Sequence, residues 1–236
     1  MSPAPLRPAR WAPVAVCVAA FALCPAFTSP SAAQTPTQKS APPVIAPVPE
    51  KPLPWLVVDA RGGYPSLGLD ELTARGLGVA TAELPGRART LVVGAHVYPL
   101  RRGAFKIGLG GELLRGSGSS QKKDATGKAA GPVVHRRLNS VSAQVSLNFG
   151  RGAGWSYVTA GTGPFKFESY LNEAEPDSTG ASTINVGGGA RWFNWDHVAF
   201  SVDLRFYLTK PAAATLVTAA RERARIVLFS AGISLK

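Results

Sequence analysis

Apolar and polar residues alternate along the chain from Trp55 to its C-terminus. In the clearest case, every second residue from Val198 to Phe206 is apolar, and the residues between them include Asp203 and Arg205. Alternation with a period of two predicts a β-strand whose two faces contact different media. Because two charged residues lie in mid-strand, we interpret the polar face as the crowded interior of a barrel and the apolar face as its exterior.

The same alternation recurs in eight segments, joined by connections of two lengths. The predicted strands span residues 55–64, 89–98, 104–115, 138–149, 155–163, 185–193, 198–207 and 225–236. Short turns are expected at 99–103, 150–154 and 194–197, and long loops at 65–88, 116–137, 164–182 and 209–224. The first long loop is expected to contain a short helix at 70–75. The second is a low-complexity stretch rich in Ser, Gly and Lys.

Alternation alone does not separate a membrane barrel from a soluble one, in which the aliphatic residues would fill the core. Here, however, the strand count is even, the strands are near the ~9–11 residues of a tilted spanning strand, and long and short connections alternate. Aromatic residues at strand ends beside the short turns predict an interfacial girdle of Trp55, Tyr98, Phe149, Trp155, Trp192 and Trp195. We therefore predict an all-β fold, an eight-stranded antiparallel up-and-down transmembrane β-barrel with long extracellular loops and short periplasmic turns.

Three runs of sequence carry a resemblance to a known family. The run NVGGGARWF…HVAFSVDLRFY, with YVTAGTG before it and SAGISLK at the end, resembles the bacterial outer-membrane β-barrel domain family of small eight-stranded proteins. The similarity covers residues 55–236. It implies insertion by the barrel assembly machinery, which in that family reads a final strand ending in an aromatic residue. Here Gly232 and Leu235 keep part of that signal, but Lys236 ends the chain.

The N-terminal segment 1–33 has the features of a cleaved signal peptide. Arg7 and Arg10 precede an apolar run at 11–27, and the small residues at 31–33 form a cleavage site. A transmembrane anchor is the alternative, but the run is shorter than the ~20 residues that a spanning helix needs. We therefore expect export to the outer membrane of a Gram-negative cell.

Residues 34–54 are rich in proline and lack periodicity, which predicts a disordered linker before a barrel domain at 55–236. The two cysteines, Cys17 and Cys24, fall within the predicted signal peptide. The mature chain is therefore expected to fold without disulfides.

The chain is strongly basic, with 26 Lys and Arg residues against 14 Asp and Glu residues and a formal net charge of +12. Such a surplus indicates an anionic partner. Because an exported chain rarely meets nucleic acid, we expect no nucleic acid and instead predict contact with outer-membrane lipids, including the phosphates of lipopolysaccharide. The predicted contact residues cluster in the second long loop and its flank: Lys122, Lys123, Lys128, Arg136 and Arg137.

Polar residues on the inward faces predict a packed lumen, because an eight-stranded barrel leaves an interior that side chains fill. The predicted network comprises Asp59, Arg61, His96, Lys106, Glu112, Gln144, Asn148, Asn185, Arg191, Asp203 and Arg205. Opposite charges there are expected to pair, since an unpaired buried charge costs on the order of several kcal/mol.

The sequence predicts no catalytic residue, metal site or cofactor. His96 is expected in the lumen, His135 in a loop and His197 in a short turn, so none is placed as a base beside a hydroxyl. Histidine and cysteine are too few for a metal cluster. We predict a monomeric, non-enzymatic protein with a structural or surface-interaction role. The alternatives are a narrow porin-like channel, a lipid-modifying outer-membrane enzyme, and a soluble periplasmic β-barrel that binds an apolar ligand.

Overall fold

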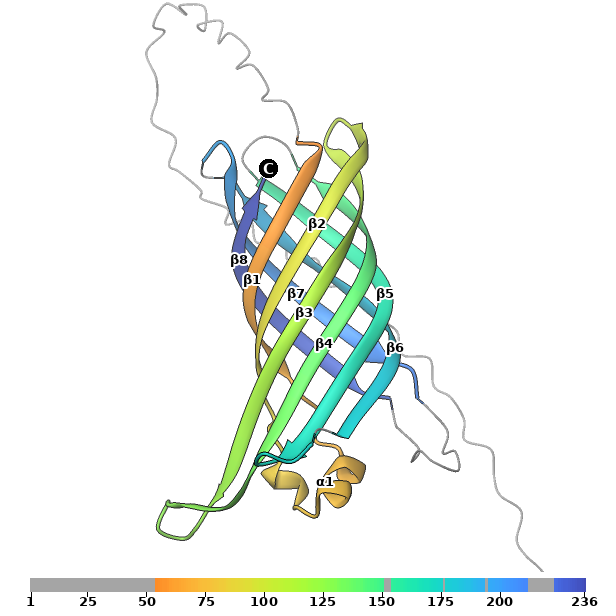
Figure 1. The fold of residues 1–236 in the computed structure, drawn as a ribbon. Helices are drawn as coiled ribbons and strands as arrows, with labels where there is room; N and C mark the ends of the chain where they lie inside the picture. Colours follow the sequence, from red (N-terminus) through yellow and green to blue (C-terminus); the bar gives the residue numbers. More distant parts are fainter. Residues whose placement is uncertain (1–53, 151–153, 176, 194, 212–222) are drawn as a thin grey trace, which may run out of the picture. The chain divides into compact units, whose positions relative to one another are not determined.

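In the computed structural model, the residues described are 54–150, 154–175, 177–193, 195–211 and 223–236. These residues form eight strands that close into one antiparallel barrel, in which each strand pairs with its neighbours in sequence and β1 pairs with β8 (Figure 1). The elements are β1 (Leu56–Ser66), α1 (Glu71–Leu77), the 3-10 helix η1 (Thr81–Glu83), β2 (Arg89–Arg102), β3 (Phe105–Lys123), β4 (Ala129–Phe149), β5 (Gly154–Leu171), β6 (Asp177–Trp192), β7 (Val198–Thr209) and β8 (Arg225–Leu235). The predicted all-β, eight-stranded up-and-down barrel is confirmed.

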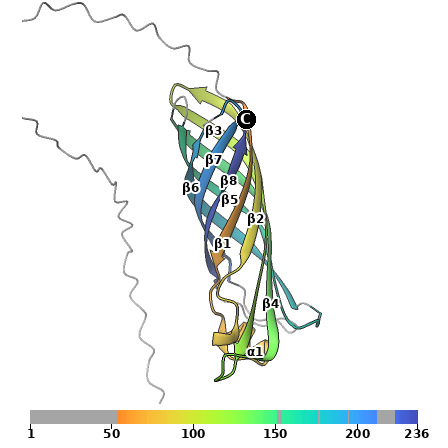
Figure 2. The ribbon, with the colours of Figure 1, turned by 90° about the vertical axis from the view of Figure 1, so that its left-hand side faces the viewer.

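The two ends of the barrel carry different connections. The turn end, as we name it, carries the β2–β3, β4–β5 and β6–β7 connections and the C-terminus. The loop end carries α1 and the long β3–β4 hairpin, which lie at the same end of the barrel in two views (Figures 1 and 2). Which end faces the cell exterior stays a prediction. The predicted signal peptide at 1–33 and the predicted linker at 34–54, except its last residue, lie outside the described residues.

The helix predicted in the first long connection is present as α1. Asp70 caps its N-terminus by accepting a hydrogen bond from the backbone N–H of Leu72. Gly78 ends it with a φ of 67°, a left-handed conformation that favours glycine. Buried Ala74 and Val134 of β4 belong to one apolar cluster, which holds the helix at the loop end. Among the described residues, no helix is long and apolar enough to cross a membrane.

The predicted loops at 116–137 and 164–182 are wrong over most of their length. β3 and β4 extend to 19 and 21 residues, and they pair from Ser117–Arg137 to Lys123–Ala129. Most of the first stretch is therefore a β-hairpin. β5 and β6 pair across most of the second stretch. The backbone ladder continues there without the apolar alternation that marks a membrane-facing strand, because hydrogen bonds between strands do not depend on side-chain polarity.

A tight turn at 124–128 closes the β3–β4 hairpin. Asp124 Oδ1 accepts hydrogen bonds from the Thr126 hydroxyl (2.6 Å), the Thr126 N–H (2.8 Å) and the Lys128 N–H (3.0 Å). These donors, the Thr126 hydroxyl above all, hold the pKa of the Asp124 carboxyl below its usual value. Gly127 takes a φ of 82°, which completes the turn. The hairpin therefore has an ordered tip.

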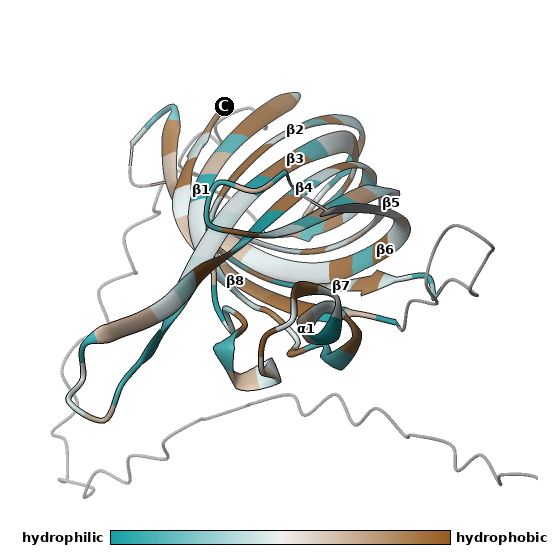
Figure 3. Cartoon of the chain, turned by 60° about the horizontal axis from the view of Figure 1, so that its bottom comes forward, coloured by the Kyte–Doolittle hydropathy of each residue, from teal (hydrophilic) through white to brown (hydrophobic). Residues whose placement is uncertain are grey.

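The two faces of the barrel wall have opposite character. In β4, Val145 is 53% exposed, whereas the neighbouring Gln144 and Ser146 are buried. Figure 3 shows apolar and polar positions alternating along the strands. The outward aliphatic side chains, which we call the apolar belt, include Val58, Leu91, Val93, Val97, Ile107, Leu109, Leu113, Val141, Val145, Leu147, Val158, Ile184, Val186, Leu204, Val227, Ile233 and Leu235. This distribution is the inverse of that in a soluble barrel.

The lumen is filled in three layers. Near the turn end lies an apolar cluster of Val57, Tyr98, Trp155, Phe193 and Ala199. The middle layer is ionic. Toward the loop end lies a second apolar cluster of Leu67, Ala88, Val92, Leu114, Leu138, Phe165, Tyr207, Ile226 and Leu228. The ionic layer is therefore enclosed by apolar side chains on both sides.

Candidate functional site

The ionic layer is built around a ring of four side chains from β1, β3 and β7. Arg61 contacts Glu112 at 2.6 Å and Asp203 at 2.9 Å, and Arg205 contacts the same two carboxylates at 2.6 and 3.0 Å. Each arginine thus bridges both acids. The hydroxyl of Tyr207 also donates to Glu112, at 2.9 Å. Arginine suits this role because its planar fork donates in several fixed directions at once.

A second ion pair joins β1 to β6. Arg191 Nη2 lies 2.6 Å from Asp59 Oδ2, and Arg191 Nε donates to Asp59 Oδ1 at 3.0 Å, so the pair is bidentate. Ser234 of β8 also donates to Asp59. A glycine makes room for Tyr157 nearby, since a Cβ on Gly189 would lie 2.7 Å from the Tyr157 hydroxyl and would collide with the backbone carbonyl of Val202.

The structure places every predicted lumen residue inside the barrel, but it does not bring all of them into the ionic ring. His96 Nδ1 lies 4.0 Å from Asp59, and Gln144 donates to Asn185 at 3.5 Å. Lys106 lies apart near the turn end, 3.8 Å above the Trp155 ring. The lumen residues named in the prediction are all buried, with exposures of 0–4%. An open aqueous pore would leave such groups accessible to water.

The predicted aromatic girdle is only partly outward. Trp55, Trp192 and Trp195 are exposed, whereas Phe149 is half-buried against Phe105. These residues lie at or near the turn end. They are the ones for which the girdle interpretation still stands.

Tyr98 and Trp155 are corrections to that girdle, because both are buried inside the barrel and pack edge to face at 5.8 Å. The reason is strand parity. Tyr98 shares a face with His96, and Trp155 shares a face with Tyr157. Together with Phe193, 5.0 Å from Trp155, they fill the lumen near the turn end.

The five basic residues predicted for lipid contact are dispersed. Lys123 and Lys128 are exposed at the hairpin tip, and Lys122 lies 3.2 Å from Glu83. Arg137 faces outward with its guanidinium 5.0 Å from the Tyr170 ring. The prediction of lipid contact is wrong for Arg136, which is 6% exposed and points into the barrel mouth. It faces away from Arg137 because adjacent residues of a strand face opposite sides.

The structure shows a row of outward cations that was not predicted as a set, although Arg137 was among the predicted contact residues. It consists of Arg89, Arg115, Arg137 and Lys166 on four consecutive strands, β2 to β5. Shallow grooves lie between these side chains. This cationic row borders the apolar belt, since Leu91 is paired with Arg115 and the outward residues Leu113 and Val141 follow toward the turn end. The signal in the sequence was a basic residue beyond the loop end of the outward apolar stripe on each of these four strands.

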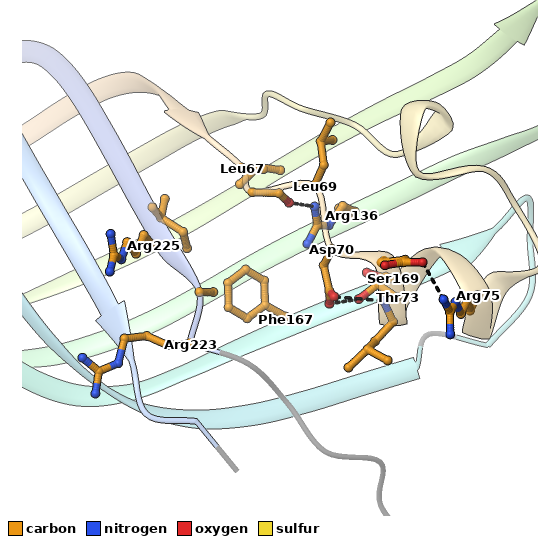
Figure 4. Close-up of a pocket in the computed structure, with 15 residues that line it drawn as sticks. Leu67, Leu69, Asp70, Thr73, Arg75, Arg136, Phe167, Ser169, Arg223 and Arg225 are labelled. Atoms are coloured by element: carbon orange, nitrogen blue, oxygen red, sulfur yellow. Dashed lines mark hydrogen bonds and ion pairs between the residues drawn. The ribbon is translucent and has the colours of Figure 1, made fainter. Parts of the chain in front are cut away.

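A pocket of about 590 Å³ opens at the loop end between α1, β5 and β8 (Figure 4). Leu67, Phe167 and Ile226 form an apolar part of its wall, and Arg136 and Ser169 enter it from β4 and β5. Arg223 and Arg225 are exposed at its edge. The pocket is thus apolar on one side and cationic on another.

These features define a class of protein. A closed eight-stranded barrel with aliphatic side chains outside and a sealed ionic layer inside is a β-barrel of the outer-membrane type. The expected likeness to small eight-stranded outer-membrane proteins is confirmed at the level of the fold.

Comparison with one solved structure, that of Neisserial surface protein A, supports that fold. No family model matches the sequence, and no curated protein matches it. The solved structure of Neisserial surface protein A is 12% identical, with 78% of this chain and 97% of that chain covered and a TM-score of 0.50. Ail of Yersinia pestis, in complex with the heparin analogue sucrose octasulfate, gives 12% identity, coverage of 76% and 97%, and a TM-score of 0.45.

Proposed function

We propose that this protein is a non-enzymatic, monomeric barrel of the Gram-negative outer membrane whose loop end holds phosphate groups of lipopolysaccharide. The observation that carries the proposal is the cationic row at the border of the apolar belt. Acyl chains packed against Leu91, Leu113 and Val141 would bring lipid phosphates to the level of Arg115 and Arg137. Arginine binds phosphate oxygens through paired N–H donors, which favours this contact.

The proposal also assigns the orientation of the barrel. Lipopolysaccharide occupies the outer leaflet, so the loop end with its cationic row would face the cell exterior. The exposed Trp55 and Trp195 would then lie at the periplasmic interface, where indole rings are favoured. The lysines at the hairpin tip, Lys123 and Lys128, would reach phosphates farther from the bilayer.

A structural and binding role fits the described residues better than a channel or an enzyme. The ionic layer is closed to water on both sides, which disfavours conduction. His96 is buried in the lumen, His135 stacks on Tyr170 at 5.0 Å, and His197 is exposed at the turn end. None of the three lies within the apolar belt, which disfavours a histidine base acting beside the acyl chains.

The test compares two variants that each lose two exposed arginines. Arg115→Gln/Arg137→Gln removes charge from the cationic row, and the matched Arg101→Gln/Arg102→Gln removes it from the turn end. We expect the row variant to weaken lipopolysaccharide binding to the reconstituted full chain by about 2 kcal/mol, roughly thirtyfold at low salt, with the difference shrinking at high salt.

The turn-end variant should bind lipopolysaccharide as the parent chain does. Equal affinities for both variants and the parent would contradict the proposal, and a loss confined to the turn-end variant would reverse the orientation. Mass spectrometry of lipid A exposed to the protein tests the enzyme alternative, and the proposal expects no change of mass.

A further inference from the structure

The pocket at the loop end contains a buried cation that forms no ion pair with the described residues. Arg136 is 6% exposed, and its Nη1 donates to the backbone carbonyl of Gly68 at 2.9 Å. Its Nε is buried and has no hydrogen-bond partner. Within the described part of the chain, no carboxylate lies within 4.0 Å of the guanidinium. A buried charge without a partner is unfavourable, so the site favours an anion.

The nearest acidic side chain is already engaged elsewhere. Asp70 caps α1, where its Oδ1 accepts from the Leu72 N–H at 3.0 Å and its Oδ2 from the Thr73 hydroxyl at 2.6 Å. Glu71, also in the wall, pairs with Arg75 at 2.5 Å. The charge of Asp70 still attracts the Arg136 guanidinium across the pocket, but neither carboxylate forms an ion pair with it. Two further arginines stand at the pocket edge.

One part of the wall is suited to a hydrocarbon. Leu67 and Ile226 are buried and belong to the apolar layer below, and Phe167 packs against that layer. Leu69 and Leu72, both exposed, also line the pocket. A volume of about 590 Å³ falls within the range of ordinary small-molecule sites.

We propose that this pocket binds a small anionic amphiphile, with a carboxylate held by Arg136 and an aliphatic chain lying against Leu67, Phe167 and Ile226. This site is separate from the cationic row. Arg136 faces the interior of the barrel mouth and Arg137 faces outward, so one step along β4 divides the two binding surfaces. The two can therefore be tested independently.

The experiment uses the full chain in phospholipid bilayer discs, with methyl-labelled isoleucine, leucine and valine observed by NMR. Octanoate supplies the proposed head and chain, octanol the chain alone, and acetate the head alone. We expect octanoate to shift the methyl signals of Ile226 and Leu67 saturably, and octanol and acetate to bind at least about tenfold more weakly. Partition of octanoate into lipid would instead shift outward methyls such as those of Val145.

Variants at adjacent positions of β4 provide matched controls. Arg136→Gln should weaken octanoate binding about tenfold or more and leave octanol unchanged, Arg136→Lys should retain part of the affinity, and Arg137→Gln should bind octanoate as the parent does. Folding of each variant is checked by the shift in gel mobility on heating.

Three results would overturn the proposal. They are equal binding of octanol and octanoate by the parent chain, equal effects of Arg136→Gln and Arg137→Gln, and octanoate shifts confined to the outward methyls. The first and third need no variant, so they hold even if Arg136→Gln does not fold. If the row variant lost lipopolysaccharide binding but kept octanoate binding, the two sites would be shown to bind their ligands independently.

Discussion

Charged residues in the lumen stabilise the barrel as a ring rather than as separate pairs. Because Arg61 and Arg205 each contact both Glu112 and Asp203, loss of one carboxylate leaves two arginines sharing a single acid. Desolvation makes each such ion costly to bury, and the cost is offset only while the partners remain. The ring therefore couples β1, β3 and β7 across the lumen.

Replacing Glu112 by Gln should be strongly destabilising. The amide keeps the shape of the side chain but leaves an unbalanced positive charge in a buried site, and we expect a loss of about 3–5 kcal/mol in the free energy of unfolding. Equilibrium unfolding of the reconstituted barrel in denaturant measures it. Glu71→Gln removes an exposed ion pair and should change stability by less than about 0.5 kcal/mol. Similar losses of unfolding free energy in Glu112→Gln and Glu71→Gln would contradict the stabilising role of the ring.

Glycine at position 189 is expected to be required for packing. A Cβ there would lie 2.7 Å from the Tyr157 hydroxyl and would collide with the carbonyl oxygen of Val202. We expect Gly189→Ala to lower stability by about 1–3 kcal/mol. Gly62 is the control, because a Cβ there has no atom within 4 Å. A neutral Gly189→Ala would show that the lumen tolerates added volume. A Gly62→Ala of equal cost would show that the loss does not come from packing in the lumen.

At the residue scale, the sequence predicted which side of the wall a strand residue faces, and this was enough to group the acids and arginines of the lumen. The alternation along the strand also places Tyr98 and Trp155 on the inward face. We assigned them to the membrane interface instead because they are aromatic. Arg136 and Arg137 differ in the same way. The alternation does not predict which inward charges form ion pairs, because Arg61 contacts residues of β3 and β7 that are distant in sequence.

At the element scale, alternation located all eight strands but not the ends of those that continue beyond the apolar belt. The β3–β4 hairpin continues through Ser117 to Lys123, where glycine, serine and lysine replace the aliphatic stripe. A strand that leaves the membrane no longer needs one apolar face, so its sequence resembles a loop.

The tip of this hairpin should depend on Asp124. Asp124→Ala removes the acceptor for Thr126 and Lys128, and we expect faster amide hydrogen exchange from Gln121 to Val133 with no change in the barrel amides. Because folding lowers the pKa of Asp124, this ordering is present at neutral pH and is lost as the pH falls through the lowered pKa. Amide hydrogen-exchange protection at the tip that is unchanged both by Asp124→Ala and by the lowered pH would contradict this account.

At the scale of the whole barrel, the lumen is sealed by two apolar layers with the ionic layer between them. Planar bilayers containing the purified chain should therefore show no steady conductance at physiological salt. Stable, reproducible single-channel steps would contradict a packed lumen and would favour the channel alternative.

The central claim is the inverted distribution of side chains across the wall, and contact with lipid tests it most directly. In bilayer discs, the methyl groups of Val145 and Ile233 should give nuclear Overhauser effects to lipid acyl chains, whereas those of Val92 and Leu228, which are buried in the lumen, should give none. Acyl-chain contacts at Val92 and Leu228, with water contacts at Val145 and Ile233, would contradict it.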